Sequence, residues 1–182
     1  ADNFQNIPEN TLQYQKAWRF LIPTIIGIIS KITNLETYFL FRFFTILCCL
    51  SLTILFILTL KKFDIDNFNI LFLTFFIICN PYLFRYFLAA PTMLNDLIFI
   101  NAGILIILGL KDNKKWIFYL GFIIALITRQ NSVFFLVSIV ISKLLFKKNS
   151  VIKFKDIVFT LLLTLIFFLI NNKFANNHST YN

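Results

Sequence analysis

The stretch Thr37–Leu60 decides the fold of this chain and reads TYFLFRFFTILCCLSLTILFILTL. It is apolar almost throughout, and it is longer than the roughly 20 residues that a helix needs to cross a hydrocarbon core about 30 Å thick. Backbone polar groups inside lipid must be satisfied within the segment, so we expect a helix. Similar apolar runs follow at Phe68–Ala89, Leu94–Leu110, Trp116–Thr128, Ser132–Phe146 and Ile157–Ile170. We therefore predict an all-α fold, a polytopic transmembrane helical bundle of about six spans with an interfacial helix on its outer face.

The composition is that of an integral membrane protein. Hydrophobic residues make up 59% of the 182 residues, and the mean hydropathy is +0.81. A soluble domain of this size could not bury so much apolar surface, and the alternating pattern of a membrane β-barrel is absent from the sequence. The net charge of +9 comes largely from lysines in short connections. That placement indicates contact with membrane lipid and no nucleic-acid partner.

Lysine and arginine occupy opposite ends of the predicted spans. Lysines crowd the connections after spans one, three and five: Lys61, Lys62, Lys111, Lys114, Lys115, Lys147, Lys148, Lys153 and Lys155. Positive charge concentrates on the cytoplasmic side, so we predict that these connections lie inside. The arginines fall at the other, outer ends: Arg19, Arg42, Arg85 and Arg129. Because arginine binds phosphate and carboxylate through two donors at once, the pattern indicates a site for an anionic headgroup at the outer face.

The sequence divides into segments of different polarity. We expect an outer polar segment, an interfacial helix, a transmembrane domain and a polar outer tail, at residues 1–17, 18–31, 32–170 and 171–182. The run Trp18–Ser30 is apolar but too short to span, which favours a helix lying on the outer face. Because the chain begins at Ala1 without Met, we interpret it as a fragment.

Two interruptions are predicted at the outer face. The second span meets Asn80-Pro81, where proline removes a backbone donor, so the helix should kink or end and an irregular segment should follow. The run Trp116–Thr128 reaches only about 20 Å at 1.5 Å per residue. It ends in the polar sequence Thr128–Ser132, from which the chain returns. These short helices predict a water-filled dent in the outer leaflet.

Ionisable side chains near the outer ends are the candidates for a functional site, because such a group inside a span costs roughly 2.5–3.5 kcal/mol. Arg129 lies in the helix break beside Gln130, and Asp96 begins the third span. For Arg129 a functional role is favoured over a structural one. We expect it to face a polar cavity within reach of Asp96 or Arg85.

Other charged residues leave two interpretations open. Arg42 is either part of the site or snorkels to the interface, and Arg19 is either part of the site or an interfacial anchor. Arg85 and Asp96 could instead form a plain ion pair. Asp2 lies in a polar segment, where a solvated carboxylate is the usual interpretation.

Cysteine and histidine do not indicate a metal site. The cysteines Cys48, Cys49 and Cys79 fall within spans and are interpreted as buried apolar thiols. The single His178 lies in the polar tail, without neighbouring ligands at metal-binding spacing.

The order of these parts resembles the membrane-embedded glycosyltransferases of the GT-C superfamily. Leu120–Ser132 resembles the hairpin in which a short helix ends in Thr plus a basic residue, here Thr128-Arg129 followed by Gln130. Pro81–Leu97 resembles the preceding loop and span, which an acidic residue heads, and Phe41-Arg42-Phe43 resembles a basic helix start. Asp2 before Ile7-Pro8 is similar to a pattern of the dolichyl-phosphate-glucose-dependent glucosyltransferases, although the acidic pair usual in the first outer loop reads Asp2-Asn3 here.

The resemblance implies a hexosyltransferase that takes sugar from a polyprenyl-phosphate carrier and passes it to an acceptor at the outer or lumenal face. It makes Asp2 the general base and Arg129 the phosphate-binding residue, with Arg85 and Asp96 lining the site. The remaining residues expected to bind substrate are Gln130, Arg42 and Arg19. It implies no cofactor and no metal, and it places the protein in a bacterial inner membrane or in the endoplasmic reticulum.

Two other functions remain open at this point. A transporter or flippase for an anionic solute or lipid would also use arginines, but typically on broken helices near the midplane. A non-catalytic membrane subunit would use the charges only for topology and pairing. The clustering of polar residues at one face favours chemistry at the interface over passage.

The charge pattern predicts a topology. Single cysteines at the Lys61, Lys114 and Lys148 positions should be cytoplasmic, and cysteines at the Asp2 and Asn182 positions should be outside. An impermeant thiol reagent, applied to intact cells expressing a background without native cysteines, reads this directly. Labelling of the Lys114 position from outside would contradict the prediction.

Overall fold

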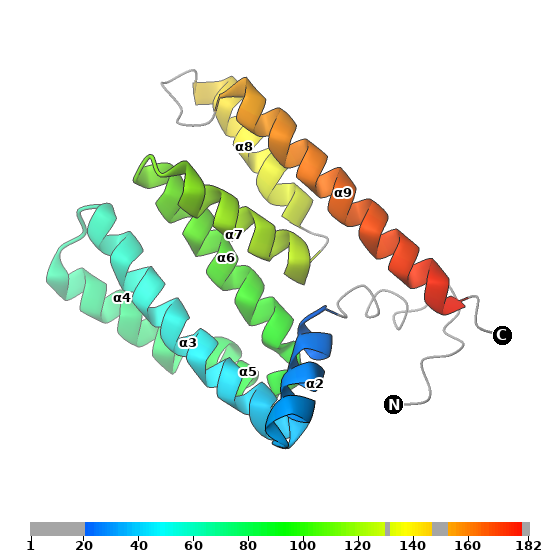
Figure 1. The fold of residues 1–182 in the computed structure, drawn as a ribbon. Helices are drawn as coiled ribbons and strands as arrows, with labels where there is room; N and C mark the ends of the chain where they lie inside the picture. The colour runs from blue at the N-terminus through cyan, green and yellow to red at the C-terminus, as the bar shows by residue number, and fades with distance from the viewer. Residues whose placement is uncertain (1–20, 130–131, 147–152, 180–182) are drawn as a thin grey trace.

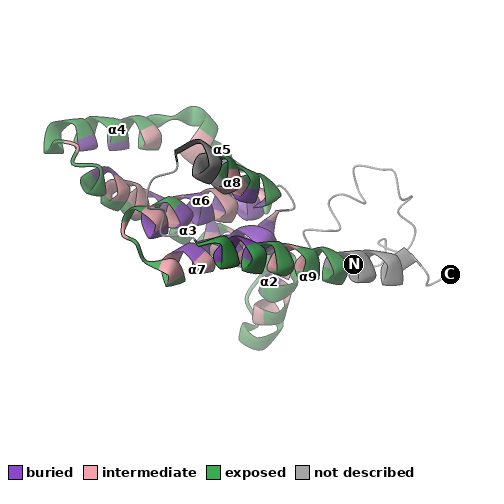
Figure 2. Ribbon diagram, turned by 90° about the horizontal axis from the view of Figure 1, so that it is seen from above, coloured by how far each residue is buried: buried purple, intermediate pink, exposed green. Residues whose placement is uncertain are grey.

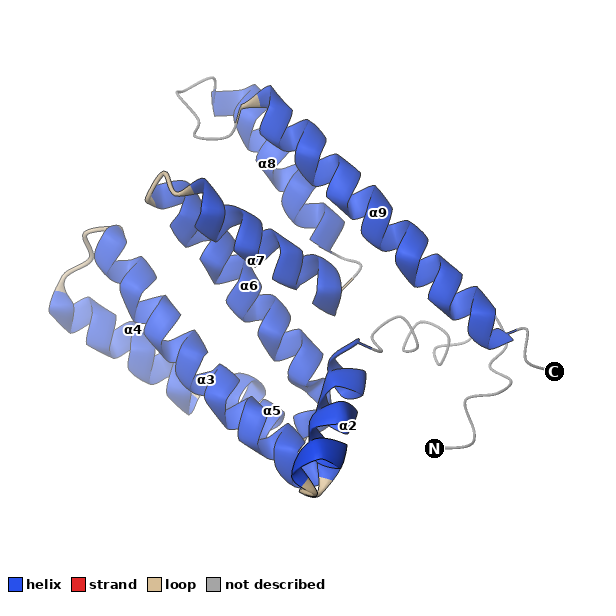
Figure 3. Cartoon of the chain, viewed as in Figure 1, coloured by secondary structure: helices blue, strands red, loops and turns tan. Residues whose placement is uncertain are grey.

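The computed structural model describes residues 21–129, 132–146 and 153–179, and within these ranges the ordered elements are helices without any strand (Figure 3). This confirms the all-α prediction. The longer helices are α2 (Leu21–Thr33), α3 (Thr37–Lys62), α4 (Asn67–Cys79), α6 (Leu94–Lys111), α7 (Lys115–Thr128), α8 (Val133–Phe146) and α9 (Phe154–Ser179). Between α4 and α6 lie a π-helical turn, the short helix α5 and a 3-10 turn, at Pro81–Arg85, Tyr86–Ala89 and Pro91–Met93.

Three helical stretches within the described residues are long and apolar enough to cross a membrane, namely Thr37–Lys62, Asn67–Ala89 and Pro91–Lys111. Only 17% of the apolar window of the first and 11% of the second is buried in the protein, against 50% of the third. Figure 2 shows the same contrast between the exposed α4 and the buried α6. Apolar surface of this extent is stable only in lipid. The chain is therefore a membrane protein, with α6 as its central helix.

The other expected spans differ in length. α7 and α8 contain 14 residues each, fewer than a full crossing needs. α7 ends at Thr128, which confirms the prediction of a short helix that stops before the polar break. α9 contains 26 residues and continues past Ile170 into the polar tail as far as Ser179.

Successive helices run in alternating directions, so the connections fall at two ends of the bundle (Figure 1). The α3–α4 turn, the α6–α7 turn and the start of α9 lie at one end, and these carry the described lysines of the turns. The short turns reverse the chain through Asn34, Asp64 and Asn113, whose φ angles are 55°, 56° and 57°. Asn and Asp tolerate this left-handed conformation better than other residues with a side chain.

The interruption after α4 is confirmed, but its form differs from the prediction. α4 ends at Cys79, and Asn80 then accepts a hydrogen bond at its Oδ1 from the Tyr82 N–H (2.8 Å). The segment from Pro81 onward is not irregular: it continues as a π-helical turn and then as α5. The asparagine cap supplies a partner for an orphan backbone donor, which lets helical structure resume directly after the proline.

α2 lies at the end of the bundle opposite the lysine-bearing turns (Figure 1). We name these two ends the arginine end and the lysine end. Its start, predicted at residue 18, falls outside the described residues, and its described part ends at Thr33. Ile26 of α2 forms a small buried cluster with Leu40 of α3 and Leu94 of α6. α2 therefore packs near the start of α3 and the start of α6; its position at a membrane interface stays a prediction.

The closest helix pair is α6 with α7, and glycine makes it possible. A Cβ atom at Gly121 would lie 2.9 Å from both the Ala102 carbonyl oxygen and the Ile106 nitrogen. A Cβ at Gly109 would lie 2.4 Å from the Phe118 nitrogen. Both contacts are with backbone, which cannot rotate away as a side chain can. Small residues allow such backbone approach in membrane helices.

Replacing Gly121 by alanine should therefore destabilise the protein by about 1–3 kcal/mol, because the new methyl group overpacks the α6–α7 contact. Gly27→Ala is the matched control, since nothing lies within 4 Å of a Cβ built there. That control should be neutral or stabilising by up to about 1 kcal/mol, because alanine is the better helix former. Thermal unfolding of the purified variants in detergent measures both changes in stability. Equal melting temperatures for Gly121→Ala and Gly27→Ala would contradict the close backbone contact at Gly121.

Candidate functional site

An ion pair between Arg129 and Asp96 lies where the end of α7 meets the start of α6. Arg129 follows α7 directly, in an extended conformation (φ −150°, ψ 139°), and Asp96 lies in the first turn of α6. The Arg129 Nη2 is 2.5 Å from the Asp96 Oδ1, and the Arg129 Nε donates to the same oxygen at 2.6 Å. The expectation that Arg129 lies within reach of Asp96 is confirmed.

The end of α7 fixes this arginine. Thr128 is buried, and its hydroxyl donates to the Ile124 carbonyl oxygen (3.0 Å) and the Ala125 carbonyl oxygen (3.1 Å). The Arg129 N–H donates to Ala125 O at 3.0 Å, and the chain then leaves the helix. A capped terminus directs the arginine side chain back over the neighbouring helix, towards Asp96.

The surroundings of the pair are partly apolar. The Arg129 guanidinium carbon is 6.0 Å from the centre of the Phe99 ring, within cation–π range. The side chains of Arg129 and Asp96 are 27% and 20% exposed, so solvent or lipid headgroups reach both. Ser132 is fully buried nearby in sequence, and its Oγ has no hydrogen-bond partner among the described atoms.

The remaining predicted residues are not all brought together. Arg42 is exposed and stacks over Tyr38, one turn earlier on α3, at 4.8 Å from the ring centre. Arg85 is exposed and forms no ion pair with a described carboxylate. The alternative of an Arg85–Asp96 pair is therefore wrong, because Arg129 takes that place. Asp2, Arg19 and Gln130 lie outside the described residues.

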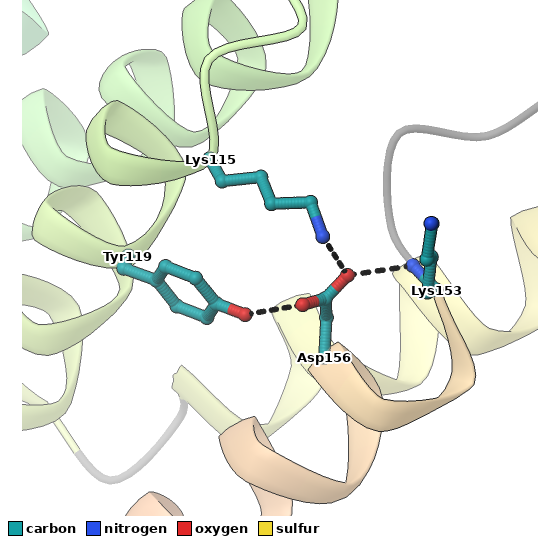
Figure 4. Close-up of polar contacts among 4 residues, drawn as sticks. All are labelled: Lys115, Tyr119, Lys153 and Asp156. Atoms are coloured by element: carbon teal, nitrogen blue, oxygen red, sulfur yellow. Dashed lines mark hydrogen bonds and ion pairs between the residues drawn. The ribbon is translucent and has the colours of Figure 1, made fainter.

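A second polar cluster joins α7 to α9 at the lysine end, and Figure 4 shows its geometry. The Lys115 Nζ donates to the Asp156 Oδ2 at 2.6 Å, and the Tyr119 hydroxyl donates to Oδ1 at 2.7 Å. The backbone N–H of Lys153 donates to Oδ2 at 2.7 Å. The Asp156 side chain is only 11% exposed.

Asp156 stays ionised because of these donors. Burial alone would raise the pKa of its carboxyl, but the hydrogen bonds from Lys115, Tyr119 and the Lys153 N–H together lower this pKa to about 2. The carboxylate is therefore a permanent negative charge that fixes the start of α9 against the start of α7. α7 separates it from the Arg129–Asp96 pair by about 20 Å, at 1.5 Å per residue.

Sequence reasoning missed this cluster. Asp156 is flanked in the sequence by lysines, so the connection has a positive net charge and was interpreted only as a topology signal. The signal that points to it is its position in the first turn of an apolar helix, where a carboxylate needs a donor. No group of three His, Cys, Asp or Glu side chains within the described part of the chain could hold a metal ion.

Comparison with known proteins gives no further assignment. No family model, curated protein or solved structure matches this chain.

Asp156→Asn should destabilise the protein by about 1–3 kcal/mol at neutral pH, because donors to a charged acceptor lose much of their binding energy. The folded-state pKa near 2 is below the ordinary value of about 4. The stabilisation is therefore complete above about pH 4 and is lost as the pH falls from there towards 2. The variant should show a flatter stability profile in that window.

Lys62→Met is the matched control for Asp156→Asn. It breaks the ion pair of Lys62 with Asp112 (3.0 Å), but the lysine is 52% exposed and should contribute less than about 1 kcal/mol. Thermal unfolding across pH measures both variants. Equal melting temperatures for the Asp156 variant and the Lys62 variant would contradict the role of the cluster in joining α7 to α9.

Proposed function

We propose that this protein is an integral-membrane glycosyltransferase, which moves a sugar from a polyprenyl-phosphate carrier to an acceptor at the outer or lumenal face. The observation that carries the proposal is the position of Arg129. It lies at the end of a short helix, beside the acidic residue that heads the neighbouring span. This is the arrangement that the resemblance to the GT-C superfamily led us to expect.

The geometry of the ion pair leaves Arg129 able to bind a second anion. Asp96 is contacted only through Nε and Nη2, on one edge of the guanidinium group. Arginine has five N–H donors in a planar fork, so the other edge still presents donors for two oxygens of one phosphate. Asp96 holds the plane of that fork in a single orientation, which reduces the entropy lost when a phosphate binds.

The pair itself is electrically neutral, so a phosphate needs further positive charge. Arg42 near the start of α3 and Arg85 directly before α5 are exposed, and in this proposal they supply it. In this proposal they attract the headgroup from the membrane surface, while Arg129 binds the phosphate of the leaving group. Gln130 and Arg19, by resemblance, complete the contacts.

The proposed reaction is a displacement at the anomeric carbon of the sugar. A carboxylate, Asp2 by resemblance, takes the proton of the acceptor hydroxyl as its oxygen bonds to the anomeric carbon. The bond from that carbon to the phosphate oxygen breaks, and the electron pair leaves with the polyprenyl phosphate. Arg129 stabilises the charge that develops on this phosphate. The membrane would be a bacterial inner membrane, or the endoplasmic reticulum membrane in a eukaryote.

Arg129→Lys tests the phosphate contact, because lysine keeps the charge but presents no planar fork. We expect transfer from a labelled polyprenyl-phosphate sugar to fall about 100-fold, as for loss of a donor that stabilises developing charge. Asp2→Asn should lower turnover by about 100-fold or more while leaving donor binding nearly unchanged, since a general base acts mainly in the transition state. Transfer and donor binding are measured separately in membranes that carry each variant or the unmodified protein.

Lys62→Gln serves as the control, because it breaks an ion pair at the opposite end of the bundle and should leave transfer unchanged. Full transfer by the Asp2 variant would remove that residue from the mechanism. Full transfer by both variants would contradict the proposed function. Flux of the lipid-linked sugar without any transfer would favour a transporter.

A further inference from the structure

The lysine end of the bundle contains basic residues at the junction of α7 and α9 that the proposed function does not use. Lys115 and the backbone N–H of Lys153 contact the same oxygen of Asp156, so the starts of α7 and α9 lie side by side (Figure 4). Lys114 directly precedes α7, and Lys153 and Lys155 lie at the start of α9, so this contact brings their backbone positions to the same junction; we name these residues the α7–α9 lysine cluster. In the sequence, Lys114 and Lys153 are far apart.

The cluster carries uncompensated charge. Lys114, Lys153 and Lys155 are exposed, and no carboxylate among the described residues lies within ion-pair distance of them. Two carboxylates at this end have other partners: Asp156 binds Lys115, and Asp112 binds Lys62. Like charges held close together repel one another, so a bound anion would stabilise this arrangement.

Exposed aromatic rings accompany the cluster. Trp116 and Phe154, which follow Lys115 and Lys153 directly, are 66% and 76% exposed. Rings beside lysines at the end of a membrane helix occupy the level of the headgroups and the first acyl carbons. The anion that fits both groups is therefore the headgroup of a lipid, not a free ion.

We propose that the α7–α9 lysine cluster binds the phosphate headgroup of an anionic phospholipid, with Trp116 and Phe154 against its glycerol and upper acyl region. The lipid would span the starts of α7 and α9 and reinforce the contact that Asp156 makes between them. This site is at the opposite end of α7 from Arg129, so it is separate from the proposed donor site.

Lys153→Gln with Lys155→Gln removes the charge without disturbing the Asp156 contacts, because Lys153 contributes its backbone N–H and not its side chain. The matched control is Lys61→Gln with Lys62→Gln, which removes the same charge from the α3–α4 turn at the same end. Both purified variants are titrated in detergent with phosphatidylglycerol and with phosphatidylcholine. Native mass spectrometry counts the bound lipid, and cysteine labelling confirms an unchanged topology.

We expect the first variant to bind phosphatidylglycerol about 30-fold more weakly, at roughly 1 kcal/mol for each of the two lysines. The affinity of the control should remain within about twofold of that of the unmodified protein, because Lys61 and Lys62 lie elsewhere on the surface, in the α3–α4 turn. Equal loss in both variants would show only diffuse attraction and would overturn the proposal. Equal binding of phosphatidylcholine, or displacement of the lipid by millimolar inorganic phosphate, would also overturn it.

Discussion

The close contact of α6 with α7 is the constraint on which the rest of the structure depends. Glycines at 109 and 121 let the two backbones approach nearer than any side chain would permit. This close approach sets the register of the two helices, and with it the distance between the start of α6 and the end of α7. Asp96 and Arg129 meet because of that register. A shift of one turn would move Arg129 by about 5.4 Å and break the ion pair.

The two ion pairs of α7 act at opposite ends and in different ways. Asp156 is almost buried and uses both of its oxygens, so its donors leave no room for a ligand. Asp96 is more exposed, and its contacts with Arg129 converge on a single oxygen. The first arrangement joins α9 to the bundle. The second holds an arginine in place while leaving part of the guanidinium accessible, which is the property that a binding site needs.

Hydropathy predicts much of this fold, because a helix in lipid needs only length and apolar composition. The spans, the short α7 and the end of α4 near Pro81 follow from local sequence. The pairing of Arg129 with Asp96 was predictable as well, since a charge in a helix break needs a nearby partner. The role of Gly121 was not, because it depends on which backbone lies opposite. The helical form of Pro81–Ala89 was missed although its signal is local, because Asn80 is a favoured N-cap residue and Pro81 is favoured in the first turn of a helix.

The neutrality of the Arg129–Asp96 pair bears on how an anion would bind there. An unpaired arginine within the apolar part of a membrane would cost several kcal/mol, so the ion pair with Asp96 stabilises Arg129 when no other anion is bound. A phosphate that displaced Asp96 would break the ion pair of this carboxylate with Arg129, which carries a cost of its own. Binding to the other edge of the guanidinium avoids this cost, because both anions are then satisfied by one cation. The repulsion between them must be offset by additional positive charge, which the proposal assigns to the exposed Arg42 and Arg85. Under the proposed function, this requirement favours an anion carried by a lipid over a small anion that arrives from water.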